Sequence, residues 1–487
     1  MTTIERRIAR GIICGLAIAS LTVAAHAADL GEVLKAPAIK DPLPDKLTWN
    51  GITLYGVVDV GYGYNSIGAP LGGSWLGLNN IVWASPAGYR PISSLNTNAY
   101  DLSVIGLKFE EPLGNGWQAV GQFDTGFNPL TGTIDDACKD IIKNNGVSPT
   151  NQTVFGPSSR CGQMFNGQAW AGVRNTEYGA LTVGRQSPLA LSKMYGYDPV
   201  QLSGAFSLLG FGLGGWAGGT GSTEAGKWNN SVKYAHEYGP IHGAVMYAQG
   251  SNGGGLHGNS YAANLGATWK AFSVDAIYTA NRDAVLSSGY GVGGCGVPGT
   301  PSCSTLASTA FNTDAWSLMG KYVYDLGDKG FGGKLIFYAG YQHIKFADPS
   351  NPVPVGSTTN GDYVLGSVNN TFFLYGSRNR DTIWVGTRYE TGPWTFTGAY
   401  YLGEQGFFRR APTQTFCADT SRSNCSGSLT VVSATADYAF TKHLDVYAGV
   451  VWSKLTGGLA RGYTTETAGY PTTPEETSVL TGVRFRF

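Results

Sequence analysis

The chain has 487 residues and equal numbers of basic and acidic side chains, 33 of each, so its charge gives no support for nucleic-acid binding. Its 71 glycines and its 27 Tyr, 21 Phe and 12 Trp residues disfavour long helices and favour β-strands. A mean hydropathy of −0.09 is too polar for a helical membrane protein, but it suits a transmembrane barrel in which only alternate residues meet lipid.

The start of the chain is typical of an export signal. Arginines precede a short apolar stretch that ends in Ala25-His26-Ala27, a small-residue cleavage pattern. The apolar stretch is too short to favour a membrane-spanning helix. We expect residues 1–27 to form a signal peptide for export through the periplasm, and residues 28–51 to form a periplasmic N-terminal segment.

From residue 52 to residue 487, segments of about ten residues alternate apolar and polar side chains, as tilted membrane strands require. We predict sixteen strands: 52–64, 99–110, 116–127, 166–177, 179–187, 227–237, 240–250, 258–270, 271–281, 313–325, 334–345, 380–391, 393–404, 429–440, 443–455 and 478–487. The links alternate between short turns, such as 238–239, and long loops, such as 65–98 and 128–165. The predicted fold is therefore all-β, a 16-stranded antiparallel transmembrane β-barrel with long extracellular loops.

The last strand separates two faces. Val479, Val483 and Phe485 share one face, whereas Arg484 and Arg486 share the other. A soluble β-sandwich would expose the charged face and a barrel would turn it toward a watery lumen, and periodicity alone leaves both open. The export signal, the aromatic content and the alternation of turns and loops favour the barrel. The charged residues predicted to line its pore are Asp59, Asp124, Lys233, Arg388, Arg484 and Arg486.

One stretch, residues 202–221, carries no charge over a length that could span a membrane as a helix. Its many glycines make a stable helix improbable. We interpret it as a loop packed inside or on top of the barrel.

Six cysteines lie outside the signal peptide, in sequence-local pairs within predicted loops: Cys138 with Cys161, Cys295 with Cys303, and Cys417 with Cys425. An oxidising periplasm permits three disulfides, and this pairing is chosen by proximity alone. A metal site is the rival interpretation, but the chain has neither C-x-x-C nor H-E-x-x-H. We therefore expect no metal and no cofactor.

A set of segments in a fixed order resembles the general Gram-negative porin family. The segments are LYGVVD at 54–59, QAWAG at 168–172, GALTVGRQ at 179–186, WNNSVKY at 228–234 and TGVRFRF at 481–487. They resemble the family's first, fourth, fifth, sixth and last strands, and the resemblance covers roughly residues 54–487.

This resemblance implies a homotrimer of barrels that contact outer-membrane lipid and lipopolysaccharide. It also implies that residues 188–226 form one inward-folded constriction loop, with Asp198 as its nearest acidic residue. Lys227 occupies a position where the family has an arginine on the wall. The terminal Phe487 resembles the signal that the barrel-assembly machinery reads.

Three departures from the family concern basic positions of the wall, because Val57, Val104 and Gly167 stand where members have basic residues. We therefore expect weak ion selectivity with a slight preference for cations. Arg185 is open to three interpretations: a constriction residue, a subunit contact, which its outward strand parity favours, or a rim residue without a special role.

The resemblance implies passive diffusion of small hydrophilic solutes and ions across the outer membrane of a Gram-negative bacterium, without catalysis. Three alternatives remain: a substrate-specific channel for a sugar or an aromatic acid, a structural or adhesive surface protein, and an outer-membrane enzyme. Conductance, its block by specific solutes and the His positions distinguish them.

Overall fold

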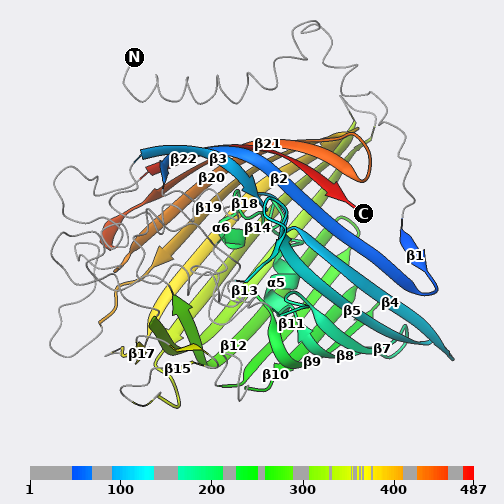
Figure 1. Cartoon of the computed structure of the whole chain (residues 1–487), viewed down its shortest axis with the longest axis horizontal. Coiled ribbons are helices and arrows are strands. Elements are labelled where there is room, and N and C mark those ends of the chain that lie inside the picture. The colour runs from blue at the N-terminus through cyan, green and yellow to red at the C-terminus, as the bar shows by residue number, and fades with distance from the viewer. Residues whose placement is uncertain are drawn as a thin grey trace, which may run out of the picture.

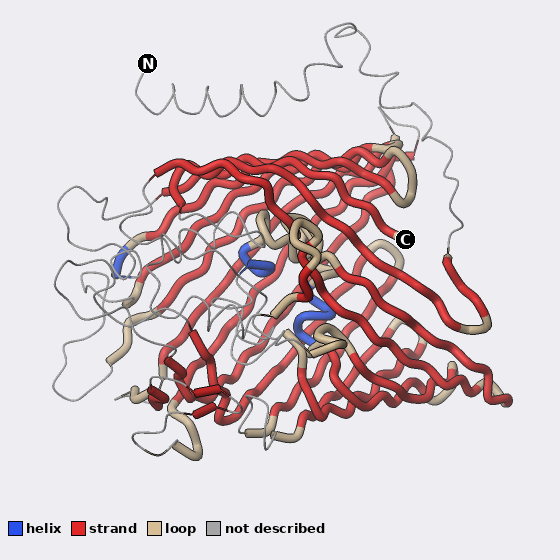
Figure 2. The backbone as a smooth tube through the Cα atoms, viewed as in Figure 1, coloured by secondary structure: helices blue, strands red, loops and turns tan. Residues whose placement is uncertain are grey.

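The computed structural model describes residues 46–68, 90–136, 163–211, 226–250, 258–288, 307–327, 332–352, 354, 359–360, 363–364, 367–373, 377–409, 425–458 and 475–487. These residues form a closed, twisted wall of strands that surrounds two short helices (Figures 1 and 2). The expected signal peptide and most of the expected periplasmic segment lie outside the described residues.

Sixteen antiparallel strands form the ring, each paired with the next along the chain, and the last pairs with the first. They are β2 (Ile52–Gly68), β4 (Val104–Gly114), β5 (Trp117–Asn128), β7 (Ala169–Asn175), β8 (Gly179–Gln186), β9 (Trp228–Tyr238), β10 (Ile241–Ala248), β11 (Ser260–Trp269), β12 (Phe272–Ser288), β13 (Ala307–Gly327), β14 (Gly333–Ala347), β18 (Arg378–Thr391), β19 (Trp394–Gln405), β20 (Gly427–Ala439), β21 (Leu444–Leu455) and β22 (Glu475–Arg486). Each predicted strand overlaps one of these, so the predicted barrel and its strand number are confirmed.

Shorter strands pair at the margins of this ring. They are β1 (Leu47–Trp49), β3 (Arg90–Thr97), β6 (Thr133–Ile134) and β17 (Ser367–Asn370), while β15 (Thr359–Asn360) and β16 (Tyr363–Val364) form a separate pair. β17 lies parallel to the start of β13, within a predicted long loop. The wall therefore continues into the loop region on this side of the barrel.

The barrel closes where the C-terminal strand meets the first strand. Phe487 exchanges two backbone hydrogen bonds with Gly56, of 2.8 and 3.1 Å. A Cβ at Gly56 would lie 2.5 Å from the Phe487 ring, so this close approach requires a glycine. Closure removes the free strand edges that a membrane interior would leave unpaired.

Alternate residues of the strands face opposite environments. Along β22, Val483 is 42% exposed on the outer surface, whereas the neighbouring Arg484 is 4% exposed on the lumen side. Exposed aromatic residues gather beside the short turns: Trp117, Tyr178, Tyr238, Trp269 and Phe272. Such a girdle is typical of the level at which a barrel meets lipid head groups. No helix in the described ranges is long and apolar enough to cross a membrane.

The second wall strand differs from its prediction. The predicted strand 99–110 begins only at Val104, and part of the predicted loop 65–98 forms β3 instead. β4 pairs with the first half of β2 and β3 with its second half. Between them, residues 98–103 turn out of the wall, because turn-forming Asn98 (φ 60°) accepts a hydrogen bond from the Ser103 N–H. We call residues 98–103 the inward bend.

Candidate functional site

Residues 187–211 lie inside the barrel and are called the constriction loop here. The loop contains α5 (Leu189–Met194) and α6 (Leu208–Phe211), and α5 contacts β10, β11 and β12. Leu189 and Met194 of α5 are buried against the wall, and Figure 1 shows both helices within the ring of strands. The part of the predicted loop from 212 to 225 lies outside the described residues.

A buried carboxylate fastens the middle of the constriction loop. Asp198 has no exposed surface and accepts hydrogen bonds from the hydroxyls of Ser207 (2.5 Å) and Tyr401 and from the Leu202 N–H (2.7 Å). Burial raises the pKa of Asp198, and the hydroxyl groups of Ser207 and Tyr401 partly oppose that shift. The predicted constriction residue therefore ties the loop to β19 rather than facing the open lumen.

Tyr197 makes a second attachment beside the first. Its hydroxyl donates to the Asp275 carboxylate on β12 at 2.8 Å, and its carbonyl accepts from the Trp384 indole at 3.0 Å. Asp275 also bonds His242 at 2.8 Å and the Asn264 amide at 2.8 Å. Tyr197 and Asp198 together therefore attach the constriction loop to β12, β18 and β19.

The end of the constriction loop meets the inward bend. The Ala99 carbonyl accepts from the Ser203 hydroxyl and from the Ala205 N–H, both at 2.8 Å. The Phe206 ring packs on Tyr100 of the bend, with ring centroids 5.9 Å apart. A Cβ at Gly449 would lie 2.6 Å from the Phe206 ring, so the wall needs a glycine there. Two inward-folded segments therefore narrow the lumen together.

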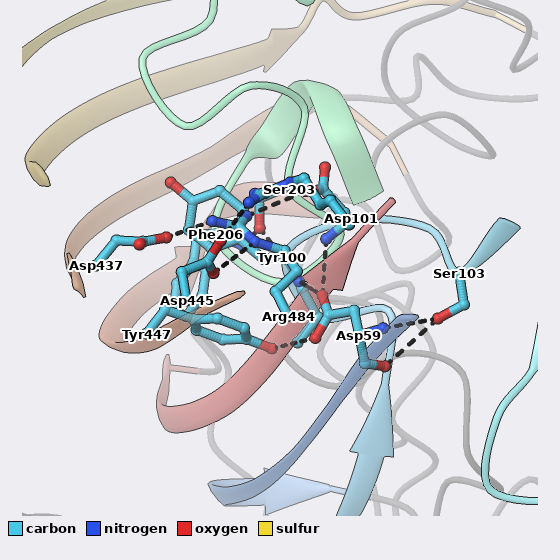
Figure 3. A network of polar contacts seen from close by, with 12 residues as sticks. Asp59, Tyr100, Asp101, Ser103, Ser203, Phe206, Asp437, Asp445, Tyr447 and Arg484 are labelled. Carbon is cyan, nitrogen blue, oxygen red and sulfur yellow. Dashed lines mark hydrogen bonds and ion pairs between the residues drawn. The ribbon is translucent and has the colours of Figure 1, made fainter. Parts of the chain in front are cut away.

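Next to this junction the lumen contains a dense network of charged residues, which Figure 3 shows. Arg484 bonds three carboxylates: Asp445 at 2.9 Å, Asp101 at 3.1 Å, and Asp437. Its guanidinium lies 4.3 Å from the centroid of the Tyr100 ring. The predicted pore-lining Arg484 and its neighbour Arg486, which also bonds Asp101 and Asp445, are thus largely neutralised.

Asp59 joins the network to the first strand. Its carboxylate accepts the backbone N–H groups of Tyr100 and Asp101, each at 2.8 Å, and the Tyr447 hydroxyl at 2.7 Å (Figure 3). Asp59 has no exposed surface. It therefore shapes the inward bend at the seam, which we define as the lumen side of β20, β21, β22 and β2.

A different arrangement covers the lumen face of β4, β5, β7, β8 and the periplasmic half of β9, called the open wall here. Asp124, which is 6% exposed, accepts hydrogen bonds from the Tyr55 hydroxyl (2.8 Å), the Gln122 amide (2.9 Å) and the Gln168 N–H (2.8 Å). A Cβ at Gly167 would lie 1.6 Å from an Asp124 oxygen. The glycine at this family position therefore accommodates the aspartate.

The remaining predicted residues are placed as follows. Lys227, just before β9, donates to the Ser187 hydroxyl at 2.8 Å. This bond joins the wall to Ser187, the first residue of the constriction loop. Arg388 forms an ion pair with Glu390 at 3.1 Å. Lys233 lies in the lumen with its ammonium 5.9 Å from the Trp170 ring centroid. Their effect on conduction stays a prediction.

Arg185 is held at the wall between neighbouring strands. Its guanidinium donates to the carbonyls of Asn166 (2.8 Å) and Gly167 (2.9 Å) and to the Asn229 side chain (2.6 Å). These bonds secure the chain where β7 begins. These bonds do not test whether Arg185 is a constriction residue, a subunit contact or a rim residue without a special role, so all three interpretations stay predictions.

Of the six candidate cysteines, Cys425 lies in the described part of the chain and is disulfide-bonded. Cys138, Cys161, Cys295, Cys303 and Cys417 lie outside the described residues, so the predicted pairing stays a prediction. Within the described ranges no cluster of His, Cys, Asp or Glu is arranged to hold a metal ion.

Sequence reasoning missed the inward bend and two lumen lysines. Asp101 and Tyr100 were assigned to a regular strand, although Asn, Asp and Ser around them signal a turn. Lys108 and Lys321 lie on the lumen face, 4.7 Å from the Tyr55 ring centroid and 5.5 Å from that of Tyr197. Strand parity marks both lysines as inward, but it cannot show which charges are left unpaired.

Comparisons with known proteins agree with this architecture. A family model described as Gram-negative porin matches residues 15–458. An outer membrane porin protein of Bordetella pertussis is 28% identical over 184 residues, which is 38% of this chain and 38% of that protein. The match thus spans less than half of that relative's length.

Solved structures show the same fold. OmpT of Vibrio cholerae, an outer membrane protein folded in vitro, has a TM-score of 0.52 and 14% identity, over 91% of this chain and 100% of that chain. A loop L8 deletion mutant of OmpT also gives 0.52 at 14% identity, over 90% of this chain and 99% of that one. At such low identity the likeness concerns the fold alone.

Proposed function

The chain belongs to the Gram-negative porin family and is an outer-membrane barrel, and from this premise we propose that it forms a water-filled channel. Small hydrophilic solutes and ions would diffuse through it passively, without catalysis. The observation that carries the proposal is a closed ring of sixteen strands whose lumen face is polar and whose constriction loop is bonded to that face.

The arrangement supports selection by size at a fixed narrowing. Asp198 attaches the constriction loop to β19, and Tyr197 attaches it to β12. The carbonyl of Ala99 attaches the loop to the inward bend. A loop with so many hydrogen bonds gives a constant passage, because opening it would leave buried polar groups unpaired. Charges around such a passage act on ions more strongly than charges in bulk water do.

Reconstitution of the mature protein in planar bilayers tests this proposal. We expect discrete conductance steps that persist without any energy source. An adhesive or structural surface protein would give no conductance, and that result would refute the proposal. Saturable block by one sugar or aromatic acid would replace the general pore with the substrate-specific channel.

An enzymatic role has little support from the described His residues. His242 and His343 each pair with a carboxylate, at 2.8 Å, and each carboxylate also accepts a tyrosine hydroxyl. A serine-type triad would instead require a nucleophilic hydroxyl bonded to the His. We propose that the protein acts as a channel alone.

We further propose that residues 1–27 are removed on export, and that the mature chain assembles as a homotrimer in contact with lipopolysaccharide. Membership of the porin family supports the trimer, and the aromatic Phe487 that follows β22 supports recognition by the barrel-assembly machinery. Conductance that rises in groups of three equal steps would support the trimer. Single independent steps from a crosslink-resistant monomer would contradict it.

A further inference from the structure

Three lysines of the lumen share one unusual environment. The ammonium groups of Lys108, Lys233 and Lys321 lie 4.7, 5.9 and 5.5 Å from the ring centroids of Tyr55, Trp170 and Tyr197. None of the three lysines forms an ion pair with a described residue, in contrast to Arg484, Arg486 and Arg388. The lumen therefore carries cations that are positioned but not neutralised.

These lysines lie at one level of the barrel. β4, β9 and β13 run toward the short-turn rim and end at residues 114, 238 and 327. The lysines are therefore 6, 5 and 6 residues from those ends (114 − 108, 238 − 233 and 327 − 321). One residue is about 3.3 Å along a strand, so the three positions lie at about the same level, on the second, sixth and tenth of the sixteen wall strands.

A cation–π contact differs from an ion pair in its effect on the pore. The face of an aromatic ring attracts a cation through its quadrupole, but the ring carries no net charge. A lysine over a ring is therefore held in place while its full positive charge acts on the lumen. A lysine paired with a carboxylate would present almost no field to a passing ion.

Two of the three cation–π contacts, those with Tyr55 and Tyr197, are strengthened in the same way. Tyr55 donates its hydroxyl to Asp124, and Tyr197 donates its hydroxyl to Asp275, each at 2.8 Å. Donation to a carboxylate makes the phenol ring more electron-rich, which favours a cation on its face. Both carboxylates are buried, at 6% and 2% exposure, and both accept further hydrogen bonds: Asp124 from Gln122 and Gln168, and Asp275 from Asn264. The third contact is with Trp170, and tryptophan is the aromatic residue that binds cations best.

We infer that Lys108, Lys233 and Lys321 form an anion-attracting arc along half of the wall, called the lysine arc, and that the channel favours small anions such as chloride and short carboxylates over cations. This inference rests on the proposed channel function. It replaces the slight cation preference expected from the sequence, which followed from missing wall arginines. Asp198 of the constriction loop is buried and hydrogen-bonded, and the seam carboxylates are paired with Arg484 and Arg486, whereas these lysines form no ion pair with a described residue.

The test is a reversal potential in a planar bilayer under a tenfold gradient of potassium chloride. We expect the unmodified channel to favour chloride. A triple variant, Lys108→Gln, Lys233→Gln and Lys321→Gln, should lower the chloride-to-potassium permeability ratio by a factor of about three or more, because charged rings set selectivity. Single variants should give smaller shifts in the same direction.

Lys270→Gln is the matched control. Lys270 also sits over an aromatic ring, 4.7 Å from the Trp269 centroid, but in the turn between β11 and β12 and exposed. Its substitution should leave the reversal potential unchanged. A triple Lys→Arg variant, which keeps the charge, shows whether side-chain loss alone perturbs the pore.

The outcomes separate the two proposals. No conductance from the unmodified protein would defeat the channel itself. Conductance without preference for chloride, or a triple Gln variant that conducts with the unmodified reversal potential, would refute only the inference about the lysine arc. If the Gln triple fails to insert, Trp170→Leu with all lysines present should still reduce the preference, and an unchanged value would overturn the inference.

Discussion

At the seam, Arg484 is buried and bonds Asp101, Asp437 and Asp445, and Arg486 also bonds Asp101 and Asp445. On the open wall, Lys108 and Lys233 lie over aromatic rings and have no carboxylate partner among the described residues. Both regions carry lumen charges on neighbouring strands of one barrel. The comparison shows that pairing, more than the number of charges, decides whether a lumen residue holds the fold together or acts on solutes.

The largest effect should follow from Arg484→Met at the seam. This substitution leaves three carboxylates without their shared cation, and removing one partner of a buried ion pair costs about 3–5 kcal/mol. Urea unfolding in detergent, followed by the mobility of the folded barrel on gels, measures the loss. Lys454→Gln is the control, because its pair with Glu475 is largely exposed and contributes about 0–1 kcal/mol. Equal losses in both variants would show that the network is not structural.

Gly167→Arg should give the next largest effect, although it restores a residue common in the family. Any side chain at this position meets the Asp124 carboxylate, which a Cβ would approach to 1.6 Å. Overpacking of this kind costs about 1–3 kcal/mol, and the displaced Asp124 would enter the lumen. Gly398→Ala is a matched control, because nothing lies within 4 Å of a Cβ there. Normal stability of Gly167→Arg in the urea assay would contradict this account of the site.

Tyr401→Phe should loosen the constriction loop without opening the barrel. It removes a hydroxyl that donates to buried Asp198, and an unmade buried hydrogen bond costs about 1–3 kcal/mol. We expect more open-channel noise and faster proteolysis within residues 187–211. Tyr400→Phe, on the outer face at 38% exposure, should behave like the unmodified protein. Identical noise in the two variants would remove Asp198 from its anchoring role.

The sequence predicted the ring of strands because period-two alternation and turn residues are local signals, and all sixteen strands are present. It also predicted that Arg484, Asp59 and Lys233 face the lumen. It could not predict their roles, because the partners of Arg484 come from residues as distant as Asp101. It missed the inward bend, where the backbone N–H groups of Tyr100 and Asp101 donate to the Asp59 carboxylate instead of to a neighbouring strand.

The smallest effect, and the finest test of the comparison, should come from Tyr55→Phe. The phenylalanine ring remains under Lys108, but the hydrogen bond to Asp124 is lost, so the ring holds the ammonium less strongly. We expect the chloride preference to fall by less than about twofold, since a cation–π contact at an exposed site contributes about 0.5–1 kcal/mol. Tyr55→Leu, which removes the ring, should reduce it further. If both variants keep the unmodified reversal potential, the aromatic ring does not hold Lys108 in place. The open wall would then differ from the seam only in that its lysines have no carboxylate partner among the described residues.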